Sequence, residues 1–385
     1  MVASHAWSPT SSKADGQPKS SAATRRAYFV DILRLIASFQ MVNGHTLDAV
    51  LLDSARGGSL WGDYLWFRGM VSVSFMFVAG FAFHLATLAR FEKHRARPEE
   101  IKRRFRRGVD LIIIGYLLRV PYDYLLRPGE IPDTLIDQLL RCNVLQCIGV
   151  TLIVLELITV LAKRPRQVAV AATVLAAAIV FTAPLTDRID PHGPFHIVLS
   201  YVSHQAGSMF PVIPWATFML AGAAIGFWAM PDAAKTQWPL TLSRLLIVAL
   251  ALWVVGKLIA AAGISGAGSG VHPNSQPRFI VERLMAVTLV TAGLCVVSFR
   301  IKRFPKLLRT LSGETLFLYV FHLVVIFSLP FGVSRTIGRT LALPQALVVS
   351  CVMLAVTAAA GVAWSRSKSW REQRRRSMNQ MEGLS

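Results

Sequence analysis

Long apolar stretches recur along the whole chain, and each is close to the roughly 20 residues that an α-helix needs to cross a hydrocarbon core of about 30 Å. The composition agrees, since 54% of the 385 residues are hydrophobic and 16% are charged, whereas charged residues make up about a quarter of an ordinary soluble domain. The apolar stretches cover approximately residues 28–47, 65–89, 108–127, 143–162, 167–184, 207–229, 243–262, 279–299, 311–330 and 342–364. The sequence therefore predicts an all-α polytopic membrane protein of about ten transmembrane helices.

The distribution of Lys and Arg predicts the orientation of these helices, because basic residues resist translocation and collect on the cytoplasmic side. The two tails and the even-numbered loops carry 29 of the 41 Lys and Arg residues, and the odd-numbered loops carry 8. Both termini are therefore expected in the cytoplasm. Residues 1–24 are predicted to form a disordered cytoplasmic tail, residues 25–364 the transmembrane domain, and residues 365–385 a basic cytoplasmic tail.

The formal net charge of +20 does not indicate a nucleic-acid partner. The basic residues lie in short clusters between apolar stretches instead of covering one face of a soluble domain, so the lipid bilayer is the expected partner. The cysteines show no metal-ligand spacing, so no metal is expected and they are interpreted as packing residues. They are Cys142, Cys147, Cys295 and Cys351.

The first predicted helix carries ionisable side chains at both ends, and such residues inside a membrane mark functional sites unless they pair internally. Asp31 and Arg34 are three residues apart on one helix face, which predicts a local ion pair near the cytoplasmic interface and does not prevent Arg34 from also meeting an anion. His45 follows about 16 Å further along the helix axis, near the outer end. A neutral imidazole there serves either as an interfacial hydrogen-bond partner or as a base for a hydroxyl or an amine.

Other polar residues of the predicted helices could serve either a structural role, such as packing or hydrogen bonding, or a functional one. The small residues of helix two indicate close helix packing, and His84 at its inner end indicates an interhelical hydrogen bond. Arg141 and Gln146 lie at the outer start of helix four. Glu282 and Arg283 lie at the outer part of helix eight, where adjacent residues do not face one another and are expected to have different partners.

Helix nine is expected to begin at residue 312 or 313, with Glu314 in its first turn, where the helix dipole favours a carboxylate. His322 then lies near mid-membrane with Tyr319 three residues before it, and a hydrogen bond across the bundle is its structural interpretation. Asp110 and Glu156 are expected to make buried polar contacts near the inner side. The basic inner loop after helix two could meet anionic lipid or a nucleotide phosphate, although topology alone accounts for it.

Five short motifs follow one another along the helices. They are Asp31-Ile-Leu-Arg34 with Met41, Asn43 and His45; Phe75-Met-Phe-Val-Ala-Gly80; Val144-Leu-Gln-Cys-Ile-Gly149; Phe210-Pro-Val-Ile-Pro-Trp215 with Gly222 and Gly226; and Leu311-Ser-Gly-Glu-Thr-Leu-Phe-Leu-Tyr-Val-Phe-His322. Together they resemble the transmembrane acyltransferases, most closely the bacterial relatives of heparan-alpha-glucosaminide N-acetyltransferase. Arg34 with His45 also resembles the arginine and histidine pair of acyltransferase family 3. The chain departs from the animal enzyme in lacking a large luminal domain and a longer first outer loop with its own histidine.

The resemblance implies transfer of an acyl group, commonly acetyl, from acyl-CoA on the cytoplasmic side to a hydroxyl or amine of an outer-face glycan, in the bacterial cytoplasmic (inner) membrane. His45 is the expected base, with His322, His84 or an outer-loop histidine as alternatives. Stabilisation of the tetrahedral oxyanion is assigned to Asn43 or Gln146. The donor phosphates are assigned to Arg34, Arg103, Arg104 and Arg107, and the acceptor to Arg141, Gln146 and Glu282.

A second class of function is a membrane transporter for a glycan precursor or small metabolite, which would use the same buried charges as a pathway. No internal repeat and no matching pair of broken helices is evident in the sequence, which weighs against transport. Covalent gain of an acyl group would indicate the enzyme, and flux without covalent change would indicate the transporter. The sequence leaves open whether the chain works as a monomer or as a homo-oligomer.

Overall fold

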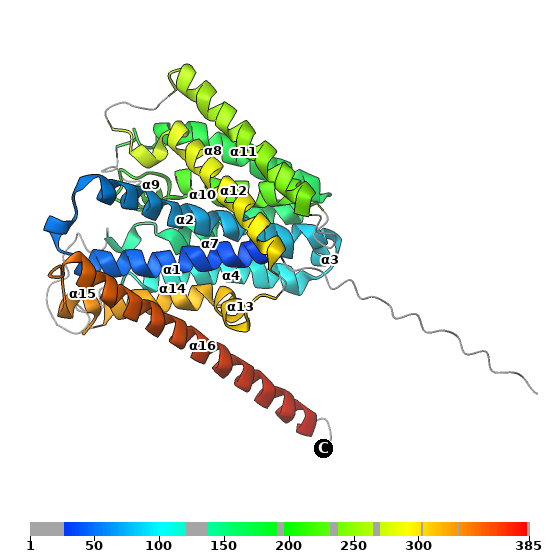
Figure 1. Ribbon diagram of the computed structural model, residues 1–385. Helices are drawn as coiled ribbons and strands as arrows, with labels where there is room; N and C mark the ends of the chain where they lie inside the picture. Colours follow the sequence, from blue (N-terminus) through cyan, green and yellow to red (C-terminus); the bar gives the residue numbers. More distant parts are fainter. Residues whose placement is uncertain are drawn as a thin grey trace, which may run out of the picture.

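The computed structural model describes residues 27–120, 138–190, 196–231, 238–264, 270–301, 303–329 and 331–382. Within these residues every regular element is helical, and extended backbone occurs as one isolated bridge between Leu51 and Leu341. The long helices run side by side in one bundle (Figure 1). The prediction of an all-α fold is confirmed.

Eight helical segments of the described chain are long and apolar enough to cross a membrane. They contain α2 (Gly58–Ala86), α7 (Val144–Leu161), α8 (Pro165–Thr186), α10 (Val212–Ala229), α11 (Trp238–Ala261), α12 (Pro277–Arg300), α14 (Thr315–Leu323) with the π-helix η4 (Val324–Ser328), and α16 (Leu343–Glu382). Two further long helices contain charged side chains: α1 (Tyr28–Val50), which matches the first predicted span, and α4 (Pro98–Leu117), which overlaps the predicted span 108–127 and has its charges between residues 99 and 110. The chain is therefore a polytopic membrane protein.

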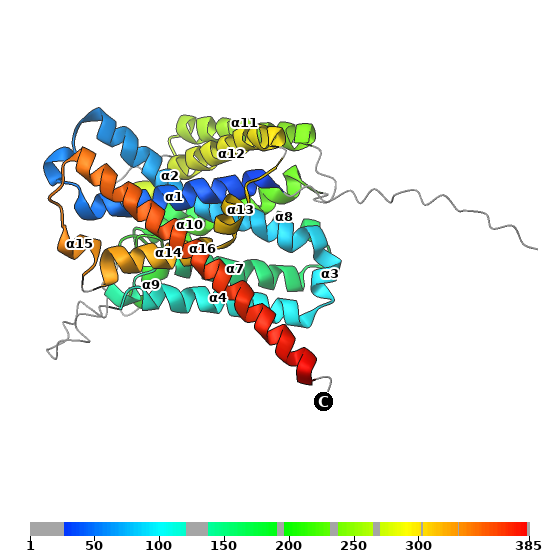
Figure 2. The same cartoon turned by 60° about the horizontal axis from the view of Figure 1, so that its bottom comes forward.

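Short elements occupy the two ends of the bundle. One end, here the basic end, holds η2 (Leu88–Arg90), α3 (Phe91–Arg95) and α13 (Lys306–Gly313). The opposite end holds η1 (Asp53–Ala55), α9 (His196–Val202), η3 (Pro273–Ser275) and α15 (Val333–Thr336). Figures 1 and 2 both show α3 and α15 at opposite ends, with α16 starting beside α15 and running obliquely along the bundle.

Four elements differ most from the sequence-based boundaries. α2 begins at Gly58 where a start near residue 65 was predicted, and α4 covers Pro98–Leu117 where residues 108–127 were predicted. Helix nine is broken at Glu314, because α13 ends at Gly313 and α14 begins at Thr315. Helix ten was expected to end near residue 364, whereas α16 continues as one helix through most of the predicted basic tail to Glu382. The break lies where α13, α14 and α16 contact one another. α16 continues because Lys, Arg, Glu, Gln and Met are good helix formers and neither Gly nor Pro occurs between residues 362 and 382.

Close backbone contact between α2 and α10 holds the centre of the bundle together. A Cβ atom added at Gly80 would lie 1.8 Å from the Met219 carbonyl oxygen, and one added at Gly222 would lie 2.1 Å from the Phe77 carbonyl oxygen. Glycine at these positions lets the two helices approach more closely than any side chain would permit, as is usual between transmembrane helices. The predicted packing role of the small residues in helix two is confirmed.

The predicted roles of His84 and of three cysteines are also confirmed. The His84 Nε2 donates to the Met230 carbonyl oxygen over 2.9 Å, which joins α2 to the end of α10. The buried cysteines are Cys142, Cys147 and Cys295. Cys351 is exposed on α16, so its interpretation as a packing residue is wrong.

Replacing Gly80 by alanine should lower the apparent melting temperature of the detergent-solubilised protein, because overpacking of a tight contact costs about 1–3 kcal/mol. The matched control is Gly293→Ala on α12, where an added Cβ meets no atom within 4 Å. This control should leave the melting temperature unchanged or slightly higher, since alanine is the better helix former. Equal effects of the two substitutions would contradict the packing account.

Candidate functional site

A cavity of about 410 Å³ opens near the opposite end of the bundle, between α1, α2, α7, α10 and α14. Its polar lining residues are Gln40, His45, Arg68, Ser72, Asn143, Asn274 and Tyr319, and its aromatic ones include Phe210 and Trp215. We call it the histidine cavity after His45. It combines groups that accept protons, donate hydrogen bonds and stack on rings, which are the requirements of group transfer to a polar acceptor.

His45 lines this cavity and contacts His322, which comes from a different helix and does not line the cavity itself. Their rings stack with centroids 5.5 Å apart, and Phe327 contacts the His45 ring edge-on. The described part of the chain supplies no hydrogen bond to the His45 imidazole, so its nitrogens can meet a ligand. His322 is fully buried behind it and donates from Nδ1 to the Leu318 carbonyl oxygen over 2.7 Å, which leaves its Nε2 as the acceptor.

An ion pair between Arg68 of α2 and Asp48 of α1 forms part of the same wall. Gly44 makes room for it, since a Cβ atom there would lie 3.3 Å from the Arg68 Nε. Sequence analysis missed Arg68 as a site residue. The available signal was an arginine inside a predicted transmembrane helix, which is costly unless it is paired or functional.

The residues assigned to the oxyanion lie elsewhere. Asn43 faces α16, where its Oδ1 accepts a hydrogen bond of 2.6 Å from Ser350. Gln146 is fully buried, and its Oε1 accepts from the Asn143 backbone N–H over 3.0 Å. Neither residue lines the histidine cavity.

Asn143 lines that cavity in their place. It is the N-cap of α7, and its Oδ1 accepts from the Val144 N–H over 2.7 Å while Gln146 completes the capping box. Because the oxygen is engaged with the backbone, the NH₂ group is the part of the amide that remains to donate toward the cavity. The sequence signal was an asparagine with a glutamine three residues later at a helix start.

The predicted acceptor residues Arg141 and Glu282 are not among the lining residues of the histidine cavity. Glu282 is exposed and pairs with Arg278 one turn away, over 2.7 Å. Arg141 packs on Gly207, and its carbonyl oxygen accepts from Arg119 over 3.2 Å. Arg283 instead contacts the Trp66 carbonyl and the Phe279 ring, so the prediction of different partners for Glu282 and Arg283 is confirmed.

A second cavity of about 390 Å³ lies nearer the basic end. Three of the four arginines assigned to a donor line it, namely Arg34, Arg104 and Arg107, whereas Arg103 does not. We call it the arginine cavity. A smaller cavity of about 270 Å³ shares Arg34 with it and adds Arg90, which extends the cationic surface toward the helix ends.

Phe75 of α2 lines both main cavities, which therefore approach each other at this residue. Two other helices also contribute to both cavities. On α1, Arg34 lines the arginine cavity and His45 the histidine cavity. On α14, Leu316 lines the arginine cavity and Tyr319 the histidine cavity. Within the part of the chain that the structure describes, Phe75 is the one residue that lines both of these cavities.

Buried polar contacts hold the cationic wall in place. Arg104 donates to the Thr87 hydroxyl over 2.8 Å, and its Nε lies 3.9 Å from the Glu156 carboxylate, which is fully buried on α7. His94 of α3 lies 2.6 Å from the other oxygen of Glu156. Arg34 pairs with Asp31 over 3.9 Å. The predicted pairing of Asp31 with Arg34 and the buried contact of Glu156 are both confirmed.

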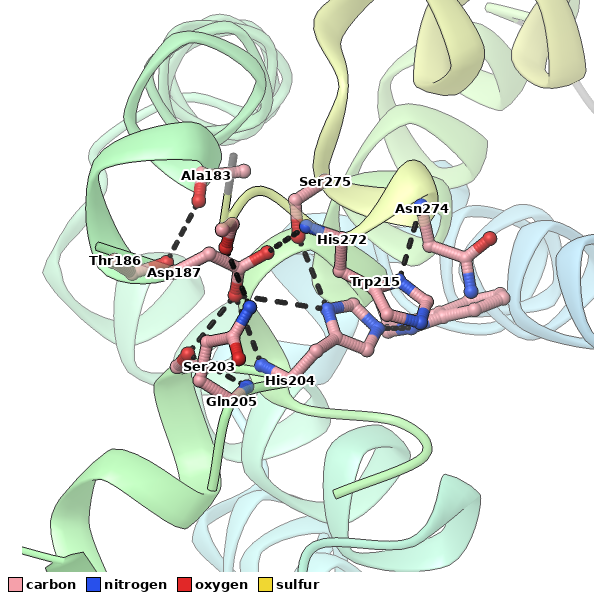
Figure 3. A network of polar contacts seen from close by, with 11 residues as sticks. Ala183, Thr186, Asp187, Ser203, His204, Gln205, Trp215, His272, Asn274 and Ser275 are labelled. Carbon is pink, nitrogen blue, oxygen red and sulfur yellow. Dashed lines mark hydrogen bonds and ion pairs between the residues drawn. The ribbon is translucent and has the colours of Figure 1, made fainter. Parts of the chain in front are cut away.

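A polar network around Asp187 supports the far wall of the histidine cavity (Figure 3). Asp187 accepts hydrogen bonds from the Ser203 hydroxyl and from the backbone N–H groups of His204 and His272, over 2.9–3.1 Å. Trp215 donates from Nε1 to the His204 Nε2 over 3.1 Å, so His204 carries its proton on Nδ1 and donates to the Ser275 hydroxyl. The network thereby ties three loops to Trp215, which lines the cavity.

This network should make stability depend on pH. Burial and the adjacent His272 lower the pKa of His204 to about 4, from its usual 6.5. The folded protein therefore binds fewer protons than the unfolded chain between these values, and stability falls as the pH drops below 6.5. The apparent melting temperature should be lower at pH 5 than at pH 7.5, and His204→Gln should reduce that difference. A difference of the same size in the variant would contradict the assignment to His204.

Comparison with known families matches residues 26–259 to the family described as heparan-alpha-glucosaminide N-acetyltransferase, catalytic. The match includes α1, most of the helices that line both cavities, and the residues Arg34, His45, Arg104 and Asn143. It ends within α11, so α12 to α16, with His322, lie beyond it. No curated protein matches the chain.

Proposed function

Because the chain belongs to the heparan-alpha-glucosaminide N-acetyltransferase catalytic family, we propose that it transfers an acyl group, in the first place acetyl, from cytoplasmic acyl-CoA to a hydroxyl or amine of a glycan at the outer face of the membrane. The observation that carries this proposal is the pair of cavities that meet at Phe75. One offers cations to an anionic donor, and the other offers a histidine and amides to a polar acceptor. We place the protein in the bacterial cytoplasmic membrane.

The arginine cavity suits the donor. Coenzyme A carries several phosphate charges on its nucleotide end, and guanidinium groups such as those of Arg34, Arg104 and Arg107 bind phosphate through charge-assisted hydrogen bonds. The excess of Lys and Arg at this end favours a cytoplasmic location, where acyl-CoA is made. The remaining wall is apolar, with Phe75, Phe83 and Leu111, and suits the thin pantetheine arm that would carry the thioester toward Phe75.

The histidine cavity suits the acceptor and the reaction. His45 would take a proton from the acceptor hydroxyl or amine, whose oxygen or nitrogen then attacks the thioester carbonyl carbon. The NH₂ group of Asn143 and the guanidinium of Arg68 would stabilise the tetrahedral oxyanion. Collapse of this intermediate breaks the carbon–sulfur bond, and the leaving thiolate takes the proton back from His45. Each turnover then yields the acylated acceptor and coenzyme A.

Three roles are assigned differently from the sequence-based prediction. Asn143 replaces Asn43 and Gln146 as the proposed oxyanion donor, since it lines the cavity and they do not. His322 is proposed to position His45 through the stacked ring contact and not to act as the base, because it is fully buried. The acceptor is proposed to bind against Trp215, beside the amides of Asn143 and Asn274, in place of Arg141 and Glu282.

Replacing His45 by glutamine should reduce acyl transfer by about 10²–10⁴-fold, because it removes the general base. Acetyl-CoA should still bind, since the donor cations lie in the other cavity. The assay is acceptor-dependent release of coenzyme A thiol by purified protein, with donor binding measured separately. Near-normal turnover of the variant would exclude His45 as the base, and flux of a glycan precursor without thioester cleavage in the wild type would favour the transporter.

Replacing Arg104 by glutamine should raise the KM for acetyl-CoA about tenfold and leave kcat at saturating donor nearly unchanged, because the lost contact is to the donor's phosphates in both ground and transition states. The neighbouring Arg103 offers a matched control, since it carries the same charge but does not line the arginine cavity. Arg103→Gln should leave KM close to that of the wild type. Equal effects would indicate that only the overall charge of the loop matters.

A further inference from the structure

One face of α16 contacts the break between α13 and α14. Gly361, Trp364 and Lys368 lie at helical spacing along this face. Trp364 stacks on Phe317 with ring centroids 4.9 Å apart, and the Lys368 ammonium forms an ion pair with the Glu314 carboxylate. At Gly361, a Cβ atom would lie 2.6 Å from Leu318, so α16 approaches α14 closely there.

The same break forms part of the wall of the arginine cavity. The wall residues are Ser312, Gly313, Thr315 and Leu316. Glu314 lies between them in the chain, and its side chain is only 12% exposed. A carboxylate beside a cavity that we propose to bind phosphates would repel the ligand, and this repulsion would be strong in a poorly solvated site. Lys368 supplies a neutralising charge at this position.

Lys368 pairs with a carboxylate, whereas two of its basic neighbours on α16 contact aromatic rings. Arg371 and Arg374 lie over the rings of Trp364 and Trp370. Among the basic residues of α16 whose side chains the structure describes, Lys368 alone forms an ion pair with a carboxylate. Topology accounts for the presence of basic residues here, but it does not account for a pairing at a helix break beside a cavity.

We propose that Lys368 is a positioning residue for the acyl-CoA donor, and that the C-terminal half of α16, which contains Lys368, is part of the donor site. Its ion pair neutralises Glu314, whereas the stack of Trp364 on Phe317 holds the break that shapes the cavity wall. The inference rests on the proposed function, because it takes the ligand of the arginine cavity to be a phosphate-bearing acyl-CoA. It concerns a region beyond residues 26–259, which match the family.

The test is a charge cycle, measured as the Kd of acetyl-CoA in purified protein. Lys368→Gln leaves Glu314 without its neutralising partner and should raise Kd about tenfold. Glu314→Gln removes the repelling charge and should leave Kd at or below that of the wild type. The double variant should return to within about twofold of the wild type. A merely structural ion pair would instead be disrupted by either single substitution, so Glu314→Gln would weaken binding as well. Arg366→Gln, which loses the same charge elsewhere on α16, should have no effect.

A second ligand distinguishes an effect of charge at the donor site from an effect on the shape of the cavity. S-acetylpantetheine carries the thioester arm without the phosphates, so its affinity should be unchanged by Lys368→Gln. The proposal is overturned if Lys368→Gln leaves the Kd of acetyl-CoA unchanged, if Glu314→Gln weakens binding as much, or if both ligands are weakened equally. Melting temperatures of all variants establish that they remain folded.

Failure of this inference and failure of the proposed function give different results. If acetyl-CoA binds to the wild type and Arg104→Gln weakens it while the Lys368 variants do not, the donor site stands and the role of α16 is wrong. If the wild type does not bind acetyl-CoA at all, the proposed function fails and the inference falls with it.

Discussion

The high cost of placing charge in hydrocarbon governs this structure. A charged side chain inside a transmembrane helix is stable only if it is paired or faces a polar cavity. The chain meets this condition by pairing Asp31 with Arg34 and Asp48 with Arg68. In each pair, the arginine also lines a cavity. The residues that are costly to insert are thus the ones that supply a cation to each of the two cavities.

The close packing of α2 on α10 determines where those cavities form. Because Gly80 and Gly222 let the two backbones touch, α2 is held at the centre of the bundle, and its Phe75 lies where the cavities meet. The α1 helix places Arg34 in one cavity and His45 in the other, about 16 Å apart along its axis. A donor and an acceptor approaching from opposite ends would meet at Phe75, so the long thioester arm and not the whole donor would need to cross the membrane.

Sequence reasoning predicted the helical fold, the close packing at small residues and the clustering of Arg34, Arg104 and Arg107, because apolar length and charge leave a direct pattern in the chain. It assigned the oxyanion to Asn43 or Gln146 and missed Asn143, which lines the histidine cavity. Asn43 lies in the last third of α1 and Asn143 at the start of α7, and only the rotation of these helices about their axes places one against Ser350 and the other in the cavity. The contact of Lys368 with Glu314 was hidden for a related reason, since it joins two elements far apart in the chain.

The central claim is that the donor and the acceptor reach one reaction centre from opposite sides of the membrane. Sealed proteoliposomes test it directly, with the basic end of the protein facing outward, labelled acetyl-CoA added outside and an amino sugar trapped inside. Labelled acetyl-sugar should accumulate inside the vesicles while coenzyme A is released outside, and His45→Gln should abolish both. Product that forms only when donor and acceptor share one side, or label that enters without becoming bound to the sugar, would contradict the account.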